Sequence, residues 1–337
     1  MKIIDQDIIF LSYDEPNAEK NYADLCSKAP WAKRIHGVEG SDAAHKACAE
    51  ISETENFITI DGDTIIDPKF LQVELDLEKL KATPEFQFSW AGNIDVNGLK
   101  YGNGSIKMWT RDFVKNMKTH ENTDGSDETN IEFCYFDNYL QLNENYSTSI
   151  ISSTPQQAWR AGFREGVKMS LNRGSSIEDL KKLWWQNYNR LLIWTMIGTD
   201  VENGLWAIYG AREGVFKTMC TDWDHVQVRD FTYLNNLWQE KQLTNATNED
   251  LVEAVEVLGQ HLISELDLPI GQMPLDAQQS KFFKLLYVPH LRNVKLKNEQ
   301  WTTHTNIRRK AWKDKQCKLF ILYSQMATNY FIITKRL

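Results

Sequence analysis

Two aspartates separated by one glycine, Asp61-Gly62-Asp63, directly follow the apolar run FITI at 57–60. Such a run predicts a buried strand, and open α/β sheets bind ligands beyond the carboxyl ends of their strands. Alternate residues of a strand share a face, so both carboxylates are expected to project into one crevice. Hard oxygen ligands so placed suit Mg2+ or Mn2+ bridging to a diphosphate. We therefore predict a metal–phosphate site at this pair; an ordinary surface turn is the alternative.

The segments before the pair predict the elements that position it. Strands are expected over 7–13, 32–38 and 57–60, and helices over 17–29 and 42–53. Strands that alternate with helices in this way predict right-handed crossovers and a parallel sheet. No GxxxxGK[ST] or GxGxxG phosphate loop is present, nor a GxSxG or HExxH motif, which leaves other nucleotide-binding and hydrolytic chemistries without support.

The pattern changes twice along the rest of the chain. Short strands are expected over 86–92, 106–110 and 132–136, with a hairpin at Asn97-Gly98. From Thr154 the periodicity is helical, and helices are expected over 155–171, 176–198, 247–265 and 276–287. The fold class is therefore α/β, with a Rossmann-type mixed sheet flanked by helices over residues 1–150 and a mostly helical region over 151–337.

Composition excludes several classes of protein. The 337 residues include 12 Trp, 12 Tyr and 15 Phe, too many aromatic residues for a disordered chain. No apolar run approaches the roughly 18 residues of a membrane span, and the N-terminal segment is expected to be a strand and not a signal peptide. The five cysteines form no CxxC pair, which argues against a disulfide framework and a zinc cluster and favours the cytoplasm.

Charge is distributed unevenly. The net charge is -8, but residues 281–337 carry 13 Lys and Arg against only Glu299 and Asp314. That segment therefore has a charge of +11 and residues 1–280 have -19. Such a separation favours a polyanion partner, and we expect Arg308, Arg309 and Lys310 to contact DNA. A solvated basic surface that balances the acidic part of the chain is the alternative.

The stretch 37–70, GVEGSDAAHKACAEISETENFITIDGDTIIDPKF, resembles nucleotide-sugar glycosyltransferases of the GT-A type. The resemblance covers roughly residues 7–115 and implies a GT-A-like fold. It implies that Asp61 contacts the donor ribose or the metal, Mn2+ or Mg2+, and that Asp63 binds the metal and the diphosphate. By the same resemblance the donor is contacted by Ser12, Tyr13, Asp14, Glu15, Asp42 and His45. A third metal ligand often lies far downstream in this fold, and His225 is the candidate; an ordinary polar turn is the alternative.

The sequence indicates the acceptor-site residues less specifically than the donor-site residues. A carboxylate that takes the acceptor proton is expected at Asp95, Glu132 or Asp137. An acceptor pocket is expected at Trp90, Asn93, Tyr101, Asn103 and Trp109, although core packing is the alternative for both tryptophans.

The chain as a whole resembles phage enzymes that add a sugar to hydroxymethylcytosine in DNA. That resemblance implies a UDP-sugar donor, arabinose as the sugar, and the host cytoplasm. Unlike this chain, the best-known phage DNA glucosyltransferases have two Rossmann domains and no DxD of this kind. The alternatives are a glycosyltransferase with a non-DNA acceptor and a non-catalytic nucleic-acid-binding protein. The sequence leaves the oligomeric state open.

Overall fold

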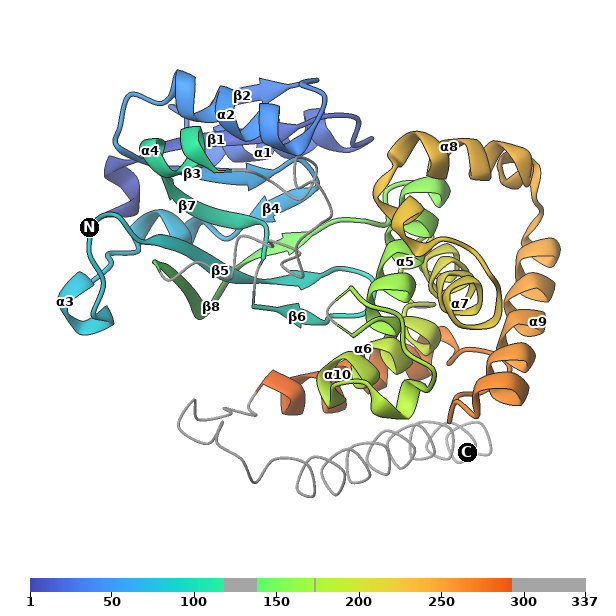
Figure 1. Cartoon of the computed structure of the whole chain (residues 1–337). Coiled ribbons are helices and arrows are strands. Elements are labelled where there is room, and N and C mark those ends of the chain that lie inside the picture. Colours follow the sequence, from blue (N-terminus) through green and yellow to red (C-terminus); the bar gives the residue numbers. More distant parts are fainter. Residues whose placement is uncertain (103, 118–137, 173, 293–337) are drawn as a thin grey trace. The chain divides into compact units, whose positions relative to one another are not determined.

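The computed structural model describes residues 1–102, 104–117, 138–172 and 174–292 (Figure 1). The chain divides into two compact units. The first contains Met1–Asp95 and Lys100–Ile150, and the second contains Val96–Leu99 together with the chain from Ile151 onward. In the described part of the chain, no helix has the length and apolar character needed to cross a membrane.

The first unit is a sheet flanked by helices. Its strands are β1 Asp7–Ser12, β2 Lys33–His36, β3 Asn56–Asp61, β4 Thr64–Ile66, β5 Gln87–Ile94, β6 Lys100–Tyr101, β7 Ile106–Thr110 and β8 Tyr139–Ser149. Its helices are α1 Ala18–Lys28, α2 Ser41–Ile51, α3 Leu77–Leu80 and α4 Arg111–Asn116, with 3-10 turns η1 Ile3–Asp5 and η2 Pro68–Gln72. The mixed α/β architecture expected from the sequence is confirmed.

The sheet is curled, and its curl brings the site together. Strand order is β2-β1-β3-β7-β5-β8-β4, and β6 pairs with β5. β1 is parallel to β2 and to β3, as the strand–helix alternation predicts. Only Gly62 and Asp63 separate the end of β3 from the start of β4, yet β4 pairs with β8, three strands beyond β3. The sheet must therefore curl around the Gly62-Asp63 link.

Alternation along the strands assigns each side chain to one face. Ile8 and Phe10 of β1 pack in the core that contains α1 residues, whereas Ile9 packs with residues of α2 and α4. On β3, Phe57 belongs to the α2 and α4 core, and the period of two places Asp61 on that face. The first aspartate of the pair therefore follows directly from a strand whose neighbouring residues are fully buried.

The second unit is helical. It contains α5 Pro155–Ser170, α6 Trp185–Met196, α7 Gly204–Cys220, α8 Phe231–Glu240, α9 Asn248–Leu266 and α10 Ala277–Arg292. Its 3-10 turns are η4 Leu180–Lys182, η5 His225–Arg229 and η6 Leu243–Asn245. α5 and α7 lie side by side (Figure 1). They approach closely because Gly162 and Gly166 of α5 face the backbone of α7, and Gly210 and Gly214 of α7 face the backbone of α5.

One expectation for this unit was wrong in its boundary, and one helix was not predicted. The helix expected over 176–198 begins only at Trp185. The buried Leu180 and Leu183 have a spacing that also occurs in α-helices, but they lie at the two ends of the short η4 turn. The pattern also gave no sign of α7, in which every residue from Ala207 to Val215 is buried. A helix that is buried on all sides has no polar face, so it lacks the periodic signal of an amphipathic helix.

Candidate active site

A cluster of carboxylates surrounds the Gly62 link. Asp61 ends β3, Asp63 follows the glycine, and Glu15 lies in the loop after β1. A Cβ atom at Gly62 would lie 2.6 Å from Glu15 Oε2 and 2.8 Å from Ser12 Cβ, so only glycine fits here without displacing the glutamate. The Asn21 amide donates a 3.0 Å hydrogen bond to the Gly62 carbonyl oxygen and fixes this link. The chain thus holds three acidic side chains around one point.

These carboxylates perturb one another. Burial raises the pKa of Asp63 to about 7, and the negative charge of Asp61 acts in the same direction, followed by those of Glu15 and Asp95. The Thr64 hydroxyl donates a 2.9 Å hydrogen bond to Asp63 and partly opposes this rise. Burial also raises the pKa of Glu15. Acidic side chains that lie this close together raise one another's pKa values, and a bound cation would lower those pKa values again.

Lys107 of β7 and His45 of α2 face the cluster from the α2 side of the sheet. Lys107 Nζ lies 4.0 Å from Asp61 Oδ2. His45 is buried, and burial lowers its pKa, so its imidazole is neutral near pH 7. Its Nδ1 lies 2.7 Å from the Ser41 carbonyl oxygen, which can only accept, so Nδ1 carries the proton. Nε2 of His45 is therefore the ring nitrogen that has a lone pair.

The donor set suits a metal held jointly with a phosphate ligand. Asp61 and Asp63 provide carboxylate oxygens, and Mg2+ is usually bound by one or two carboxylates together with substrate phosphates. Among the described residues, no group of three His, Cys, Asp or Glu side chains could hold a metal alone. His225, the expected third ligand, belongs to the second unit, where its Nε2 lies 3.1 Å from the Gly174 carbonyl oxygen. The residues present thus fit a cation whose remaining ligands come from a diphosphate.

A polar edge lies at the ends of β1 and β2, where the resemblance implies contact with the donor. Ser12 Oγ lies 2.9 Å from His36 Nδ1 and accepts a 3.1 Å hydrogen bond from Arg34 Nε. Arg34 also pairs with Glu19 at 2.7 Å, and its guanidinium lies 5.0 Å from the centre of the Tyr22 ring. Arg34 and His36 were not predicted. A charged residue on a short strand gives no signal of its own, and only the parallel pairing of β1 with β2 brings them to Ser12.

The other expected donor residues differ in exposure. Tyr13 has 46% of its surface exposed, and Asp14 is exposed beside it. Asp42 lies on α2 and forms a 2.6 Å ion pair with Lys46, four residues later. Both Tyr13 and Asp14 are accessible to a ligand, whereas Asp42 is mostly buried.

Core packing, the alternative for both tryptophans, describes Trp90 and also Trp109, which is fully buried. Trp90 is only 1% exposed and packs edge-on against Phe70, with ring centres 5.0 Å apart, because β5 is covered on both faces. Asn93 and Tyr101 are half-buried on the β5–β6 hairpin, and Asp95 follows β5. The remaining expected site residues lie outside the described residues: Asn103, Glu132, Asp137, Arg308, Arg309 and Lys310.

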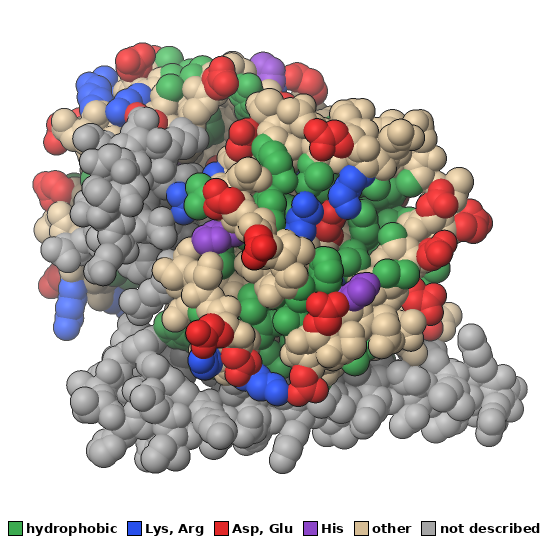
Figure 2. Space-filling model, turned by 45° about the vertical axis from the view of Figure 1, so that its right-hand side comes forward, with side chains coloured by type: hydrophobic (Ala, Val, Ile, Leu, Met, Phe, Trp, Pro, Cys, Tyr) green, Lys and Arg blue, Asp and Glu red, His purple; other side chains and the backbone are tan. Residues whose placement is uncertain are grey.

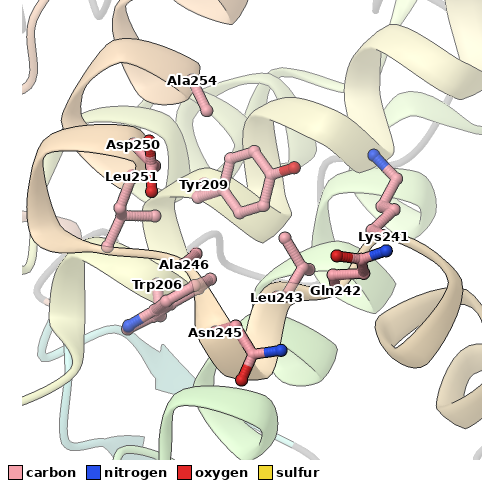
Figure 3. Close-up of a pocket in the computed structure, with 10 residues that line it drawn as sticks. All are labelled: Trp206, Tyr209, Lys241, Gln242, Leu243, Asn245, Ala246, Asp250, Leu251 and Ala254. Atoms are coloured by element: carbon pink, nitrogen blue, oxygen red, sulfur yellow. The ribbon is translucent and has the colours of Figure 1, made fainter.

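The second unit has cavities of its own. One of about 330 Å³ lies beside α7 and is lined by aromatic, amide and charged side chains, including Trp206, Tyr209, Lys241 and Asn245 (Figure 3). An adjoining apolar cavity of about 520 Å³ shares Tyr209 and Lys241 with it. Figure 2 shows hydrophobic side chains exposed on the surface of this unit, interspersed with charged side chains. None of the predicted donor or metal residues lines either cavity.

Comparison with known proteins identifies no family for this chain. No family model matches the chain, and no curated protein matches it. One solved structure that matches is a glycosyltransferase involved in the glycosylation of the major capsid of PBCV-1, with a TM-score of 0.27 and 13% identity. The alignment covers 44% of this chain and 94% of that one. Similarity of this degree assigns no function, which has to come from the residues themselves.

The raised pKa of Asp63 predicts a pH-dependent stability when no metal is bound. Folding raises this pKa from 3.8 to about 7, so the folded state binds the proton more tightly and stability falls as pH rises from about 4 to 7. Replacing Asp63 with Asn should therefore raise the free energy of unfolding at pH 8 in EDTA, by up to about 4 kcal/mol. Urea unfolding of both proteins at pH 5 and pH 8 measures this. An equal difference at the two pH values would contradict it.

Proposed function

We propose that this protein is a metal-dependent glycosyltransferase that binds a nucleotide-sugar donor at the carboxyl end of β3. The observation that carries the proposal is the acidic cluster around Gly62, in which burial and the charge of Asp61 raise the pKa of Asp63 to about 7. A sheet edge that concentrates carboxylates in this way favours a cation and, through it, an anionic ligand. Bound by Asp61 and Asp63, Mn2+ or Mg2+ would neutralise charge on the departing diphosphate.

The reaction also needs a group that accepts a proton. In glycosyl transfer the bond between the anomeric carbon and the diphosphate breaks, a bond to the acceptor oxygen forms, and the acceptor hydroxyl loses its proton. Asp95 is the one of the three candidate bases that the structure describes, and its charge acts on Asp63. In an inverting reaction Asp95 would take this proton.

For the acceptor we propose hydroxymethylcytosine in DNA, with arabinose from a UDP-sugar as the transferred group. The charge of +11 over residues 281–337 supports a polyanionic acceptor. A base modified within a duplex must leave the stack, at a cost of a few kcal/mol that phosphate contacts would offset.

One experiment tests the donor and the acceptor together. The protein is incubated with Mn2+, a panel of nucleotide sugars and DNA that contains hydroxymethylcytosine, and the digested nucleosides are weighed by mass spectrometry. A nucleoside heavier by one pentose residue, formed from the UDP-pentose alone, is the expected result. DNA left unchanged by every donor, together with transfer to a glycan or protein acceptor in a parallel incubation, would refute the DNA acceptor and leave glycosyl transfer intact.

The basic segment should control DNA binding. We expect that replacing Arg308, Arg309 and Lys310 with Ala weakens DNA binding and reduces the slope of log K against log salt by about 3, since each phosphate contact contributes roughly 0.9. Fluorescence anisotropy over a range of salt concentrations measures the slope. A slope equal to that of the wild type would show that these residues do not contact phosphates.

A further inference from the structure

We propose that Lys107 is a fixed cation of the donor site, which binds the donor diphosphate alongside the metal. This inference rests on the proposed function. It concerns a residue that the motif does not include, because Lys107 lies on β7, more than 40 positions after the aspartate pair.

The sheet itself directs Lys107 toward the site. β7 pairs with β3 in antiparallel register, with Lys107 opposite Thr59, two residues before Asp61. Residues two apart on a strand share a face, so Lys107, Thr59 and Asp61 are on the same side of the sheet. The long side chain extends from there to the end of β3, where Nζ lies 4.0 Å from Asp61 Oδ2.

The surroundings of Lys107 are those of a ligand-binding cation more than of a structural ion pair. Its side chain is only 12% exposed, and an ammonium taken out of water needs compensating partners. In the described part of the chain, Asp61 is the one carboxylate within ion-pair distance of Nζ, at a long 4.0 Å and with its own side chain 44% exposed. An ammonium has three donors, so this contact leaves capacity for an anionic ligand.

The negative charge of the cluster explains why a second cation, Lys107, would help to bind a diphosphate. Four carboxylates, Asp61, Asp63, Glu15 and Asp95, act on one another here. A diphosphate would add further negative charge, and one divalent ion would not balance the total. The Lys107 ammonium beside Asp61 would keep part of the affinity for the diphosphate when metal is scarce.

The test separates the lysine from the metal. UDP binding is measured by calorimetry for wild type, Lys107→Met and Lys107→Arg, in EDTA and in saturating Mn2+. Methionine keeps the buried aliphatic chain and removes the charge. Exposed Lys69, on η2, serves as the control through Lys69→Met, which removes one charge elsewhere. Thermal melting verifies that each variant is folded.

We expect Lys107→Met to weaken UDP binding about tenfold or more in EDTA, as the loss of a charge-assisted hydrogen bond would, and by a smaller factor in Mn2+. Lys107→Arg should retain most of the affinity, and Lys69→Met all of it. If wild type binds UDP but Lys107→Met binds it equally well in both conditions, the inference is wrong and the proposed function stands. If wild type binds no UDP with or without Mn2+, the proposed function fails and the inference fails with it.

Discussion

Replacing Asp63 with Asn should abolish sugar transfer, with a loss of about a thousandfold or more, because metal stabilisation of a departing diphosphate contributes several kcal/mol. The amide has nearly the same shape as the carboxyl group but carries no charge for the cation. Burial and the neighbouring carboxylates already raise the pKa of Asp63, so its removal does not harm the fold. The expected outcome is an inactive protein that is at least as stable as wild type.

A matched control is available four residues later. Asp67 is exposed and accepts a 2.9 Å hydrogen bond from the Lys69 amide at the start of η2, a role that Asn fulfils as well. Asp67→Asn should therefore keep full activity. DNA binding should be nearly unchanged in Asp63→Asn. Activity retained by Asp63→Asn at saturating Mn2+ would contradict the metal-binding role of Asp63, whereas no transfer by the wild type with any donor would favour the non-catalytic alternative.

Replacing Gly210 with Ala should strongly destabilise the helical unit. The added Cβ would lie 2.1 Å from the Trp159 carbonyl oxygen and 2.8 Å from the Phe163 amide nitrogen. Both are backbone atoms of α5, so no side-chain rotation relieves the clash and the two helices must separate. We expect the free energy of unfolding to fall by about 3 kcal/mol, despite the roughly 1 kcal/mol that Ala gains over Gly in a helix.

Urea unfolding followed by circular dichroism measures this loss. Gln239→Ala, at an exposed position on α8, is the control and should change stability by less than about 0.5 kcal/mol. A stability of Gly210→Ala equal to or above that of wild type would mean that α5 and α7 do not approach as closely as described.

The sequence predicted the parts of the site that follow one another along the chain. The strand before Asp61 was evident because its apolar residues are continuous, and Gly62 marked the turn. Lys107 was missed because one lysine in an apolar strand, IKMWT, is usually a solvent-facing residue. Here α2 and α4 cover that face, so the lysine is enclosed. Its approach to Asp61 depends on strand register, which no local pattern specifies.

Burial and spatial proximity account for the other differences. Trp90 has the chemistry of an acceptor residue, but its strand is covered on both faces, and a single strand does not reveal what packs on its second side. The electrostatic contact of Glu15 with Asp61 arises from the parallel pairing of β1 with β3 and from the space left by Gly62. Sequence patterns therefore located the aspartate pair at the end of a buried strand, whereas the charges that act on the pair required the structure.

The most direct test of the central claim is the position of the cation. A crystal of the protein grown or soaked with Mn2+ and UDP would reveal the metal through its anomalous scattering. We predict one peak coordinated by carboxylate oxygens of Asp61 and Asp63 and by the diphosphate of UDP. A nucleotide bound elsewhere, with no metal peak beside these two aspartates, would contradict the account.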